Sequence, residues 1–160
     1  MHATILVDNL TKNNLSPEWG LSFYLEYEGH KLLLDTGASG RFLKNADAMG
    51  LDLAQVDCGV LSHAHYDHAD GMGAFFACNS KAVFYLREGA KENCYGKKWC
   101  FHKYIGIHRG FLKTYRERIC YVSGNYEILP GVTLVPHCTP GLEEMAKWVD
   151  LYVKEGGRLR

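Results

Sequence analysis

Near the middle of the chain, a dense run of metal-ligand residues follows a short apolar stretch. The apolar stretch is Cys58–Leu61, and the run after it reads His63, Ala64, His65, Tyr66, Asp67, His68. Imidazole nitrogens and carboxylate oxygens are the ligands that borderline first-row metal ions prefer. A loop that leaves the end of a buried strand can turn successive side chains toward one point. The run therefore restricts the chain to folds in which a strand ends at a metal site.

The spacing within the run indicates two metal ions rather than one. In an extended segment His63 and His65 point to the same side, because side chains alternate with a period of two, so they can share one ion. Asp67 and His68 are adjacent and diverge, which suits a second ion beside the first. Three surface histidines on a flexible loop would be the plainer interpretation. Four ligand residues among six, between an apolar strand and Gly71, disfavour it.

The His-x-His-x-Asp-His pattern resembles that of the metallo-β-lactamase superfamily, and the neighbouring segments resemble it in the same order. Leu32–Gly37 looks like the family's earlier strand ending in Asp-x-Gly, and Gln55–His63 looks like the strand that leads into its metal loop. Within the superfamily, three short motifs are most similar to the branch of dihydropterin ribofuranosyl-aminobenzene phosphate synthase-like hydrolases. They are Leu6–Asn9, Asp35–Ser39 and Tyr104–Ile107.

The resemblance implies an α/β (α+β) fold, the four-layer αββα sandwich whose two similar halves both supply metal ligands. The common Pro-Gly-His motif of the family is approached at Thr139–Gly141, but Leu142 stands where the histidine would be. We therefore expect residues 1–160 to be a single domain that is incomplete at its C-terminus, the N-terminal half to two-thirds of the sandwich. His137 is a candidate substitute ligand, although a lone histidine near a turn is more often an ordinary hydrogen-bonded residue.

A carboxylate directly after a buried strand needs a partner, because burying an unpaired charge is costly. Asp35 is in that position, after Leu32–Leu34. We interpret it as an acceptor that orients a metal-bound imidazole. The alternative is a plain cap at the N-terminus of the following helix.

The resemblance also implies a function. We expect a metal-dependent hydrolase with two divalent ions that activate a water. Its expected substrate is a small anionic molecule, and a phosphorylated molecule is one candidate. Zinc is the first choice, with Mn²⁺ or Fe²⁺ as the other metals that similar sites accept. His63 and His65 would hold one ion, Asp67 and His68 the other, and Asp67 would accept the water's proton. The alternative is a non-catalytic metal-binding or interaction domain, or an inactive fragment with an incomplete site.

The composition of the chain limits the classes of molecule that we expect it to bind. Lys plus Arg and Asp plus Glu both number 18 in 160 residues, so no global field recruits nucleic acid or an anionic membrane. No apolar run approaches the roughly twenty residues that span a bilayer. We expect a cytoplasmic protein with a small-molecule substrate and six cysteines that are free thiols. An incomplete sandwich would leave one face of its sheet bare, so we also expect self-association.

Patterning predicts the elements. A helix is expected over Gly40–Met49, another from Leu142 to Val153, and a third with Asp70 as its N-cap. Glu88–Lys113 mixes aromatic and basic residues without a clear period. It predicts a pocket wall for an anionic aromatic ligand or, equally, a cover over the core. Strands are expected at Ala3–Val7, Leu21–Tyr27, Lys31–Leu34, Cys58–Leu61, Ala82–Leu86, Ile119–Val122, Tyr126–Leu129 and Val132–Val135.

Overall fold

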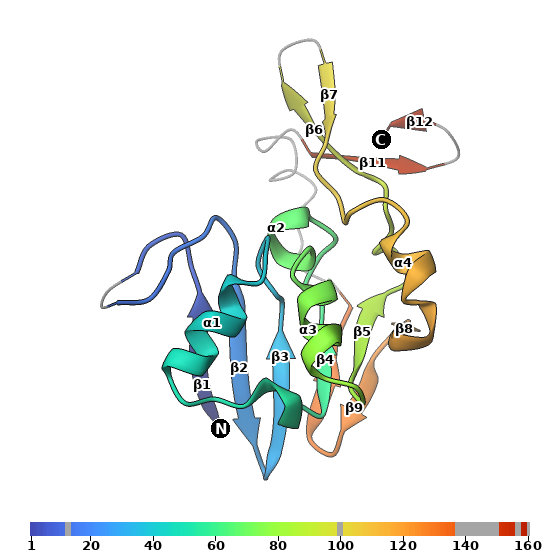
Figure 1. The fold of residues 1–160 in the computed structure, drawn as a ribbon. Helices are drawn as coiled ribbons and strands as arrows, with labels where there is room; N and C mark the ends of the chain where they lie inside the picture. The colour runs from blue at the N-terminus through green and yellow to red at the C-terminus, as the bar shows by residue number, and fades with distance from the viewer. Residues whose placement is uncertain (12–13, 99–100, 137–150, 156–157, 160) are drawn as a thin grey trace.

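The computed structural model describes residues 1–11, 14–98, 101–136, 151–155 and 158–159. Its main feature is a mixed six-stranded sheet in the order β1-β2-β3-β4-β5-β8 (Figure 1). β1, β2 and β3 are antiparallel neighbours, whereas β3, β4, β5 and β8 run parallel. The strands are β1 His2–Val7, β2 Ser22–Tyr27, β3 His30–Leu34, β4 Cys58–Val60, β5 Val83–Arg87 and β8 Ile119–Val122.

Helices cover one face of this sheet, as Figure 1 shows for α1 and α3. The core between them contains Phe42 of α1, Phe75 of α3 and Phe84 of β5, whose side chains are fully buried. Among the described residues, none of the helices has the length and apolarity needed to cross a membrane. The helical segments are α1 Arg41–Ala48, η1 Leu53–Gln55, α2 Tyr66–Ala69, α3 Met72–Cys78, α4 Phe111–Thr114 and η2 Arg116–Arg118.

The opposite face of the sheet is also apolar but less buried. A row of register partners crosses all six strands on this face, and every member of the row is at least partly exposed. A small sheet of β9 (Tyr126–Leu129) and β10 (Val132–Leu134) covers part of it, with the rings of Tyr85 and Tyr126 6.0 Å apart. The row consists of Ile5, Phe23, Leu34, Val60, Tyr85 and Cys120.

A third sheet, in the order β12-β11-β6-β7, stands beyond the carboxyl ends of the parallel strands (Figure 1). Its strands are β6 Cys94–Lys98, β7 Phe101–Tyr104, β11 Leu151–Glu155 and β12 Arg158–Leu159. The sequence shows no clear period over Glu88–Lys113, and no element was expected there, but about half of that segment is this β6–β7 hairpin followed by the start of α4. Edge-to-face packing of the Tyr95 and Tyr104 rings, 5.3 Å apart, supports the hairpin.

Two helix predictions also need correction. The expected helix from Leu142 to Val153 lies mostly outside the described residues, and its end, Leu151–Val153, is strand that pairs with β6. The chain forms a short helix, α2, before Asp70, and the residue at the N-cap of α3 is Gly71. Asp70 is therefore not an N-cap, and its carboxylate accepts the backbone N–H of His108 instead, at 2.9 Å. The α1 helix and all eight expected strands are present, with shifts of at most one residue at their ends.

Candidate metal centre

The parallel pairing of β3 and β4 brings Asp35 and the start of the His-x-His-x-Asp-His motif side by side. Leu34 and Val60 are register partners, and the backbone N–H of Asp35 donates to the carbonyl of Val60 at 2.9 Å. The segments after β3 and β4 both leave the sheet at this edge, which is where open α/β sheets place their ligand-binding sites. Asp35 and Ser62 are consequently neighbours although 27 positions separate them.

Asp35 is the centre of a hydrogen-bond network. Its carboxylate is buried, with 1% of the residue exposed, and accepts three bonds. Ser62 donates its backbone N–H to Oδ1 at 2.7 Å and its hydroxyl to Oδ2 at 2.5 Å. Nδ1 of His68 lies 2.7 Å from the same Oδ2. The carboxylate thus holds an imidazole of the motif, as the position of Asp35 in the sequence predicts, and its role at a metal stays a prediction.

The loop after β3 also forms hydrogen bonds with the backbone of α2. The N–H and the hydroxyl of Thr36 both donate to the carbonyl of His68, at 2.8 and 3.1 Å. His68 is therefore fixed at its ring and at its backbone by consecutive residues. Because Nδ1 of His68 is directed at Asp35, its Nε2 is the nitrogen left to face outward.

The hydrogen-bond donors and acceptors around Ser62 assign the same orientation to His63. The single hydroxyl proton of Ser62 goes to Asp35, so the oxygen of that hydroxyl accepts from Nδ1 of His63, 2.9 Å away. Nδ1 therefore carries the proton, and Nε2 of His63 carries the lone pair that a metal ion would need. The rings of His63 and His68 lie 4.0 Å apart, so their outward nitrogens share one region.

Protonation of the motif follows from burial and mutual charge. Burial, together with the smaller effects of the charges of His68 and His65, lowers the pKa of His63 to about 4. Burial also lowers the pKa of His65. Burial acts in the same direction on His68, but the hydrogen bond with Asp35 and that carboxylate's charge outweigh it, so the pKa of His68 is raised. His63 and His65 are hence neutral at neutral pH, the form in which imidazole binds metals.

The donor set fits divalent metal ions in part. Nε2 of His63 lies 3.1 Å from Nδ1 of His65, close to the roughly 3.3 Å between two nitrogens that bind one tetrahedral zinc at about 2.0–2.1 Å. Oδ2 of Asp67 lies 3.9 Å from Nε2 of His68. Yet in the part of the chain that the structure describes, no three histidine, cysteine, aspartate or glutamate side chains are arranged to hold an ion. The donors meet in pairs, so their orientation is preformed and a complete ligand set is not.

The remaining sequence candidate, His137, lies outside the described residues. Within them, the structure brings together His63, His65, Asp67, His68 and Asp35. Asp67 and His68 belong to a helix, α2, for which His65 is the N-cap residue, so the motif is extended only over its first half.

Sequence reasoning missed two residues that position the motif. Ser62 couples Asp35 to His63, and its place between a buried strand and the first histidine was the available signal. Glu18 is nearly buried and binds the loop that follows Asp35: its carboxylate accepts the N–H of Ala38 at 2.9 Å, the N–H of Ser39 at 3.1 Å and the Ser39 hydroxyl. No local pattern marks Glu18, because its partners are some twenty positions away.

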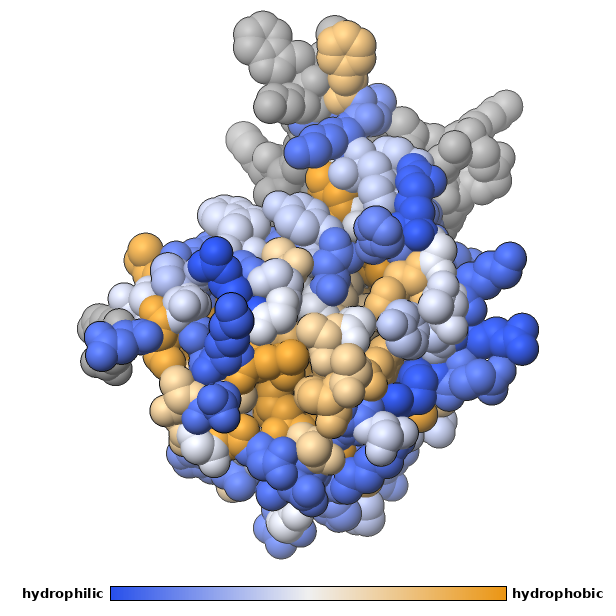
Figure 2. All heavy atoms as spheres, viewed as in Figure 1, coloured by the Kyte–Doolittle hydropathy of each residue, from blue (hydrophilic) through white to orange (hydrophobic). Residues whose placement is uncertain are grey.

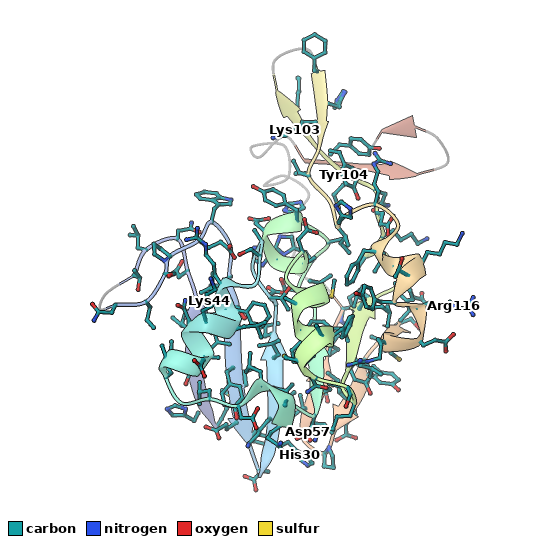
Figure 3. The ribbon with its side chains drawn as sticks, in the orientation of Figure 1. His30, Lys44, Asp57, Lys103, Tyr104 and Arg116 are labelled. Carbon is teal, nitrogen blue, oxygen red and sulfur yellow. The ribbon has the colours of Figure 1, made fainter. Side chains whose placement is uncertain are left out.

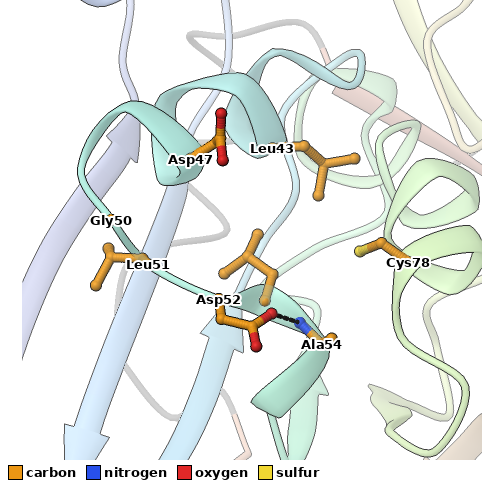
Figure 4. A pocket seen from close by; sticks show the side chains of 8 residues that line it. Leu43, Asp47, Gly50, Leu51, Asp52, Ala54 and Cys78 are labelled. Carbon is orange, nitrogen blue, oxygen red and sulfur yellow. Dashed lines mark hydrogen bonds between the residues drawn. The ribbon is translucent and has the colours of Figure 1, made fainter.

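A hollow of about 430 Å³ lies away from the motif, among α1, η1 and α3 (Figure 4). Figure 2 shows apolar side chains gathered on this helical face. The hollow is lined by aliphatic groups such as Leu43 and Leu51, and one of its carboxylates, that of Asp52, is engaged by the backbone N–H of Ala54 at 3.0 Å. It carries no imidazole and no arrangement suited to catalysis.

Comparison with known proteins gives consistent matches. The family model described as the metallo-beta-lactamase superfamily matches residues 18–141. The uncharacterized protein MJ0448 of Methanocaldococcus jannaschii is 29% identical over 106 residues, which are 64% of this chain and 39% of that protein. Among solved structures, Tm1679, described as a metal-dependent hydrolase of the beta-lactamase superfamily, superposes with a TM-score of 0.77 at 25% identity, over 99% of this chain and 56% of that one.

A quorum-quenching N-acyl homoserine lactone lactonase shares the fold, with a TM-score of 0.52 at 21% identity over 76% of this chain and 54% of that one. The chain thus spans little more than half of these solved relatives and less than half of the curated one.

Proposed function

This chain belongs to the metallo-beta-lactamase superfamily, and from that membership we propose that it supplies the metal-binding half of a hydrolase acting on a small anionic substrate. We propose that it binds two divalent ions, with zinc as the first choice, and that its substrate is phosphorylated. We also propose that it belongs to the narrower branch of dihydropterin ribofuranosyl-aminobenzene phosphate synthase-like hydrolases. The likeness to Tm1679, described as a metal-dependent hydrolase, supports the reaction class.

One observation carries the proposal: a buried carboxylate orients two imidazoles of the motif through their Nδ1 atoms. Asp35 acts on His68 directly and on His63 through Ser62. A metal-binding histidine needs a fixed tautomer whose Nε2 atom faces outward. A histidine with a purely structural role needs neither the fixed tautomer nor the outward Nε2 atom. His65 and Asp67 then add one donor each beside them.

Bound divalent ions would supply a Lewis acid and a water whose pKa is brought near neutrality. The residues of this chain would hold those ions: His63 and His65 one, Asp67 and His68 the other. Asp67, on the first turn of α2, would accept a proton from the water with the carboxylate oxygen that it does not use for binding. The Asp35 network would keep the imidazoles from turning.

Turnover of bis(4-nitrophenyl) phosphate tests the proposal. We expect hydrolysis that disappears on chelation, returns with Zn²⁺ or Mn²⁺, and is lost in His63→Ala. His30→Ala is the matched control, because His30 lies at the opposite end of the sheet (Figure 3). Since the first ion has two protein ligands here and catalytic zinc usually has three, we expect low turnover from the 160 residues and higher turnover from a chain extended at its C-terminus.

The incomplete grouping of donors favours a second candidate, a metal-binding domain without catalysis. The same experiment separates the two. Metal binding that depends on His63, without turnover in the short or in the extended chain, would support the second candidate and contradict the first.

A further inference from the structure

A second pocket, of about 300 Å³, lies directly beside the metal motif. Tyr66 and Asp70, from α2 and the residue after it, form one side. Tyr104, His108 and Arg109, from the end of β7 and the loop after it, form the other. Tyr104 lies at the base of the β6–β7 hairpin in Figure 3.

The wall of this pocket is continuous with the motif through the backbone. The N–H of Tyr66 donates to the carbonyl of Ile105 at 2.9 Å, and the N–H of Ile107 donates to the carbonyl of Ala64 at 3.2 Å. His65 and Gly106 form a β-bridge between these two bonds. A ligand in the pocket would therefore lie against the same backbone that carries His63 and His65.

Arg109 is held in place at this wall. Its guanidinium stacks over the Tyr104 ring, 4.2 Å from the centroid, and Nη2 donates to the Tyr95 hydroxyl at 2.9 Å. Carboxylates fix the backbone on both sides: Asp70 accepts the N–H of His108 at 2.9 Å, and Glu92 accepts the N–H of Gly110 at 2.7 Å. The side chain is exposed, so its remaining N–H donors are open to a ligand.

We propose that this pocket binds the substrate by an anionic group and a flat ring, with Arg109 as the anion-binding residue and Tyr66 as the surface for the ring. A planar guanidinium with several donors in a fixed fork matches the oxygens of a phosphate or carboxylate. Tyr66 lines the pocket and is 39% exposed, so its ring is available for stacking. This deepens the proposed function and rests on it: the substrate would be an aryl compound with a phosphate or carboxylate.

The charge of Asp70 gives the proposal a second, opposite readout. Its carboxylate lines the same pocket and opposes an anion there. Asp70→Asn keeps an oxygen for the N–H of His108 and removes the charge. Anion binding should therefore tighten in Asp70→Asn and weaken in Arg109→Gln.

The test is binding of phenyl phosphate to the chelator-treated chain, followed by NMR with inorganic phosphate and benzyl alcohol as reference probes. We expect phenyl phosphate to bind more tightly than either and to shift the amides of Tyr66 and His108. Arg109→Gln should raise its dissociation constant roughly tenfold or more, the size of one charge-assisted hydrogen bond. The affinity for benzyl alcohol should not change. Arg116→Gln, an exposed arginine on η2, is the matched control and should bind as the wild type does.

Equal binding by wild type and Arg109→Gln, or an equal loss in Arg116→Gln, would overturn the proposal. So would tighter binding of benzyl alcohol than of phenyl phosphate. The binding assay contains no metal and measures no turnover, so its result is independent of the turnover assay described above. Binding that depends on Arg109, together with no hydrolysis in the turnover assay, would contradict the proposed hydrolase and still support the anion pocket.

Discussion

Asp35 combines two costs that a structure seldom accepts without a reason. It is a buried carboxylate, and its backbone has a φ of 58°, in the left-handed region that few residues other than glycine, asparagine and aspartate enter. The Ser22 hydroxyl donates to its carbonyl at 2.9 Å, and Ser62 and His68 satisfy the carboxylate. The sequence could predict the carboxylate's partner type from the strand before it. It could not predict the backbone conformation or Ser62, since both depend on the parallel pairing of β3 with β4.

Replacing Asp35 by Asn should weaken metal binding more than folding. Asparagine tolerates the left-handed backbone and keeps the volume, but its single amide oxygen can replace only one of the two carboxylate oxygens. Either the backbone N–H of Ser62, or the Ser62 hydroxyl and His68, would then face an NH2 group instead of an acceptor. We expect zinc affinity to fall by about 10- to 100-fold, the usual effect of losing a partner that orients a ligand. Isothermal titration with Zn²⁺ measures it, with Asp57→Asn at the far end of the sheet as control (Figure 3). Equal affinities in the two variants would contradict the assigned role.

The lowered pKa of His63 predicts acid sensitivity of the metal-free protein. Its pKa is about 4 in the fold and 6.5 without it, so the unfolded chain binds a proton more readily between these values. His63 therefore contributes stability that is present above pH 6.5 and lost as the pH falls toward 4. His68, whose pKa is raised, acts in the opposite direction, its contribution being lost as the pH rises.

Urea unfolding of chelator-treated protein at several pH values measures this effect. We expect stability to fall from pH 6.5 to 4, and His63→Gln to flatten that fall. The effect should be smaller than the full shift implies, because part of the His63 side chain is exposed. Parallel profiles for the two proteins would show that His63 does not carry it.

At the scale of elements, alternation and turn residues predicted the strands of the main sheet, because each strand has one face on the helical core. The β6–β7 hairpin escaped prediction for the opposite reason: its aromatic and basic residues lie on an exposed ribbon, where no burial pattern forms. The end of the expected tail helix is strand because pairing with β6 decides its structure. The local period of its apolar residues did not contain that information.

The junction of α2 and α3 is expected to be intolerant of a side chain at Gly71. A Cβ there would meet the carbonyl oxygens of Thr36 and Ser39, which are backbone atoms of the loop that holds His68. We expect Gly71→Ala to lower the free energy of unfolding by about 1–3 kcal/mol, the cost of overpacking, and to weaken metal binding by shifting α2.

Gly73→Ala, inside the α3 helix that Gly71 precedes, is the control. Its Cβ would come within 3.4 Å of the Phe111 ring, an ordinary contact, and alanine favours a helix interior. Thermal unfolding of both variants checks the contrast. Equal stability of Gly71→Ala and wild type would show that the approach of α3 to the loop is loose.

At the scale of the whole molecule, the main sheet has one face covered by helices and one that is apolar and half-buried. The likeness to Tm1679 covers 99% of this chain but 56% of that one, which agrees with a sandwich present in part. Sequence reasoning reached this architecture through the metal motif and the order of its neighbours. It could not place Arg109 beside the motif, because that contact requires the loop after β7 to pair with His65.

The half-buried face predicts self-association of the 160-residue chain. We expect a concentration-dependent dimer in sedimentation equilibrium, because a large apolar surface seldom stays without a partner. Phe23→Gln, in the partly exposed row on this face, should shift the equilibrium toward monomer. Phe101→Gln, on the 73%-exposed ring of β7, should leave it unchanged. A chain that is monomeric at every concentration would contradict the prediction.

We propose above all that His63, oriented by Asp35 and Ser62, is a metal ligand. The most direct test is equilibrium dialysis against Zn²⁺ followed by elemental analysis of wild type, His63→Ala and His30→Ala. We predict bound zinc in the wild type and in His30→Ala, and a clear loss in His63→Ala at the same free zinc concentration. Equal zinc in all three proteins would contradict the claim.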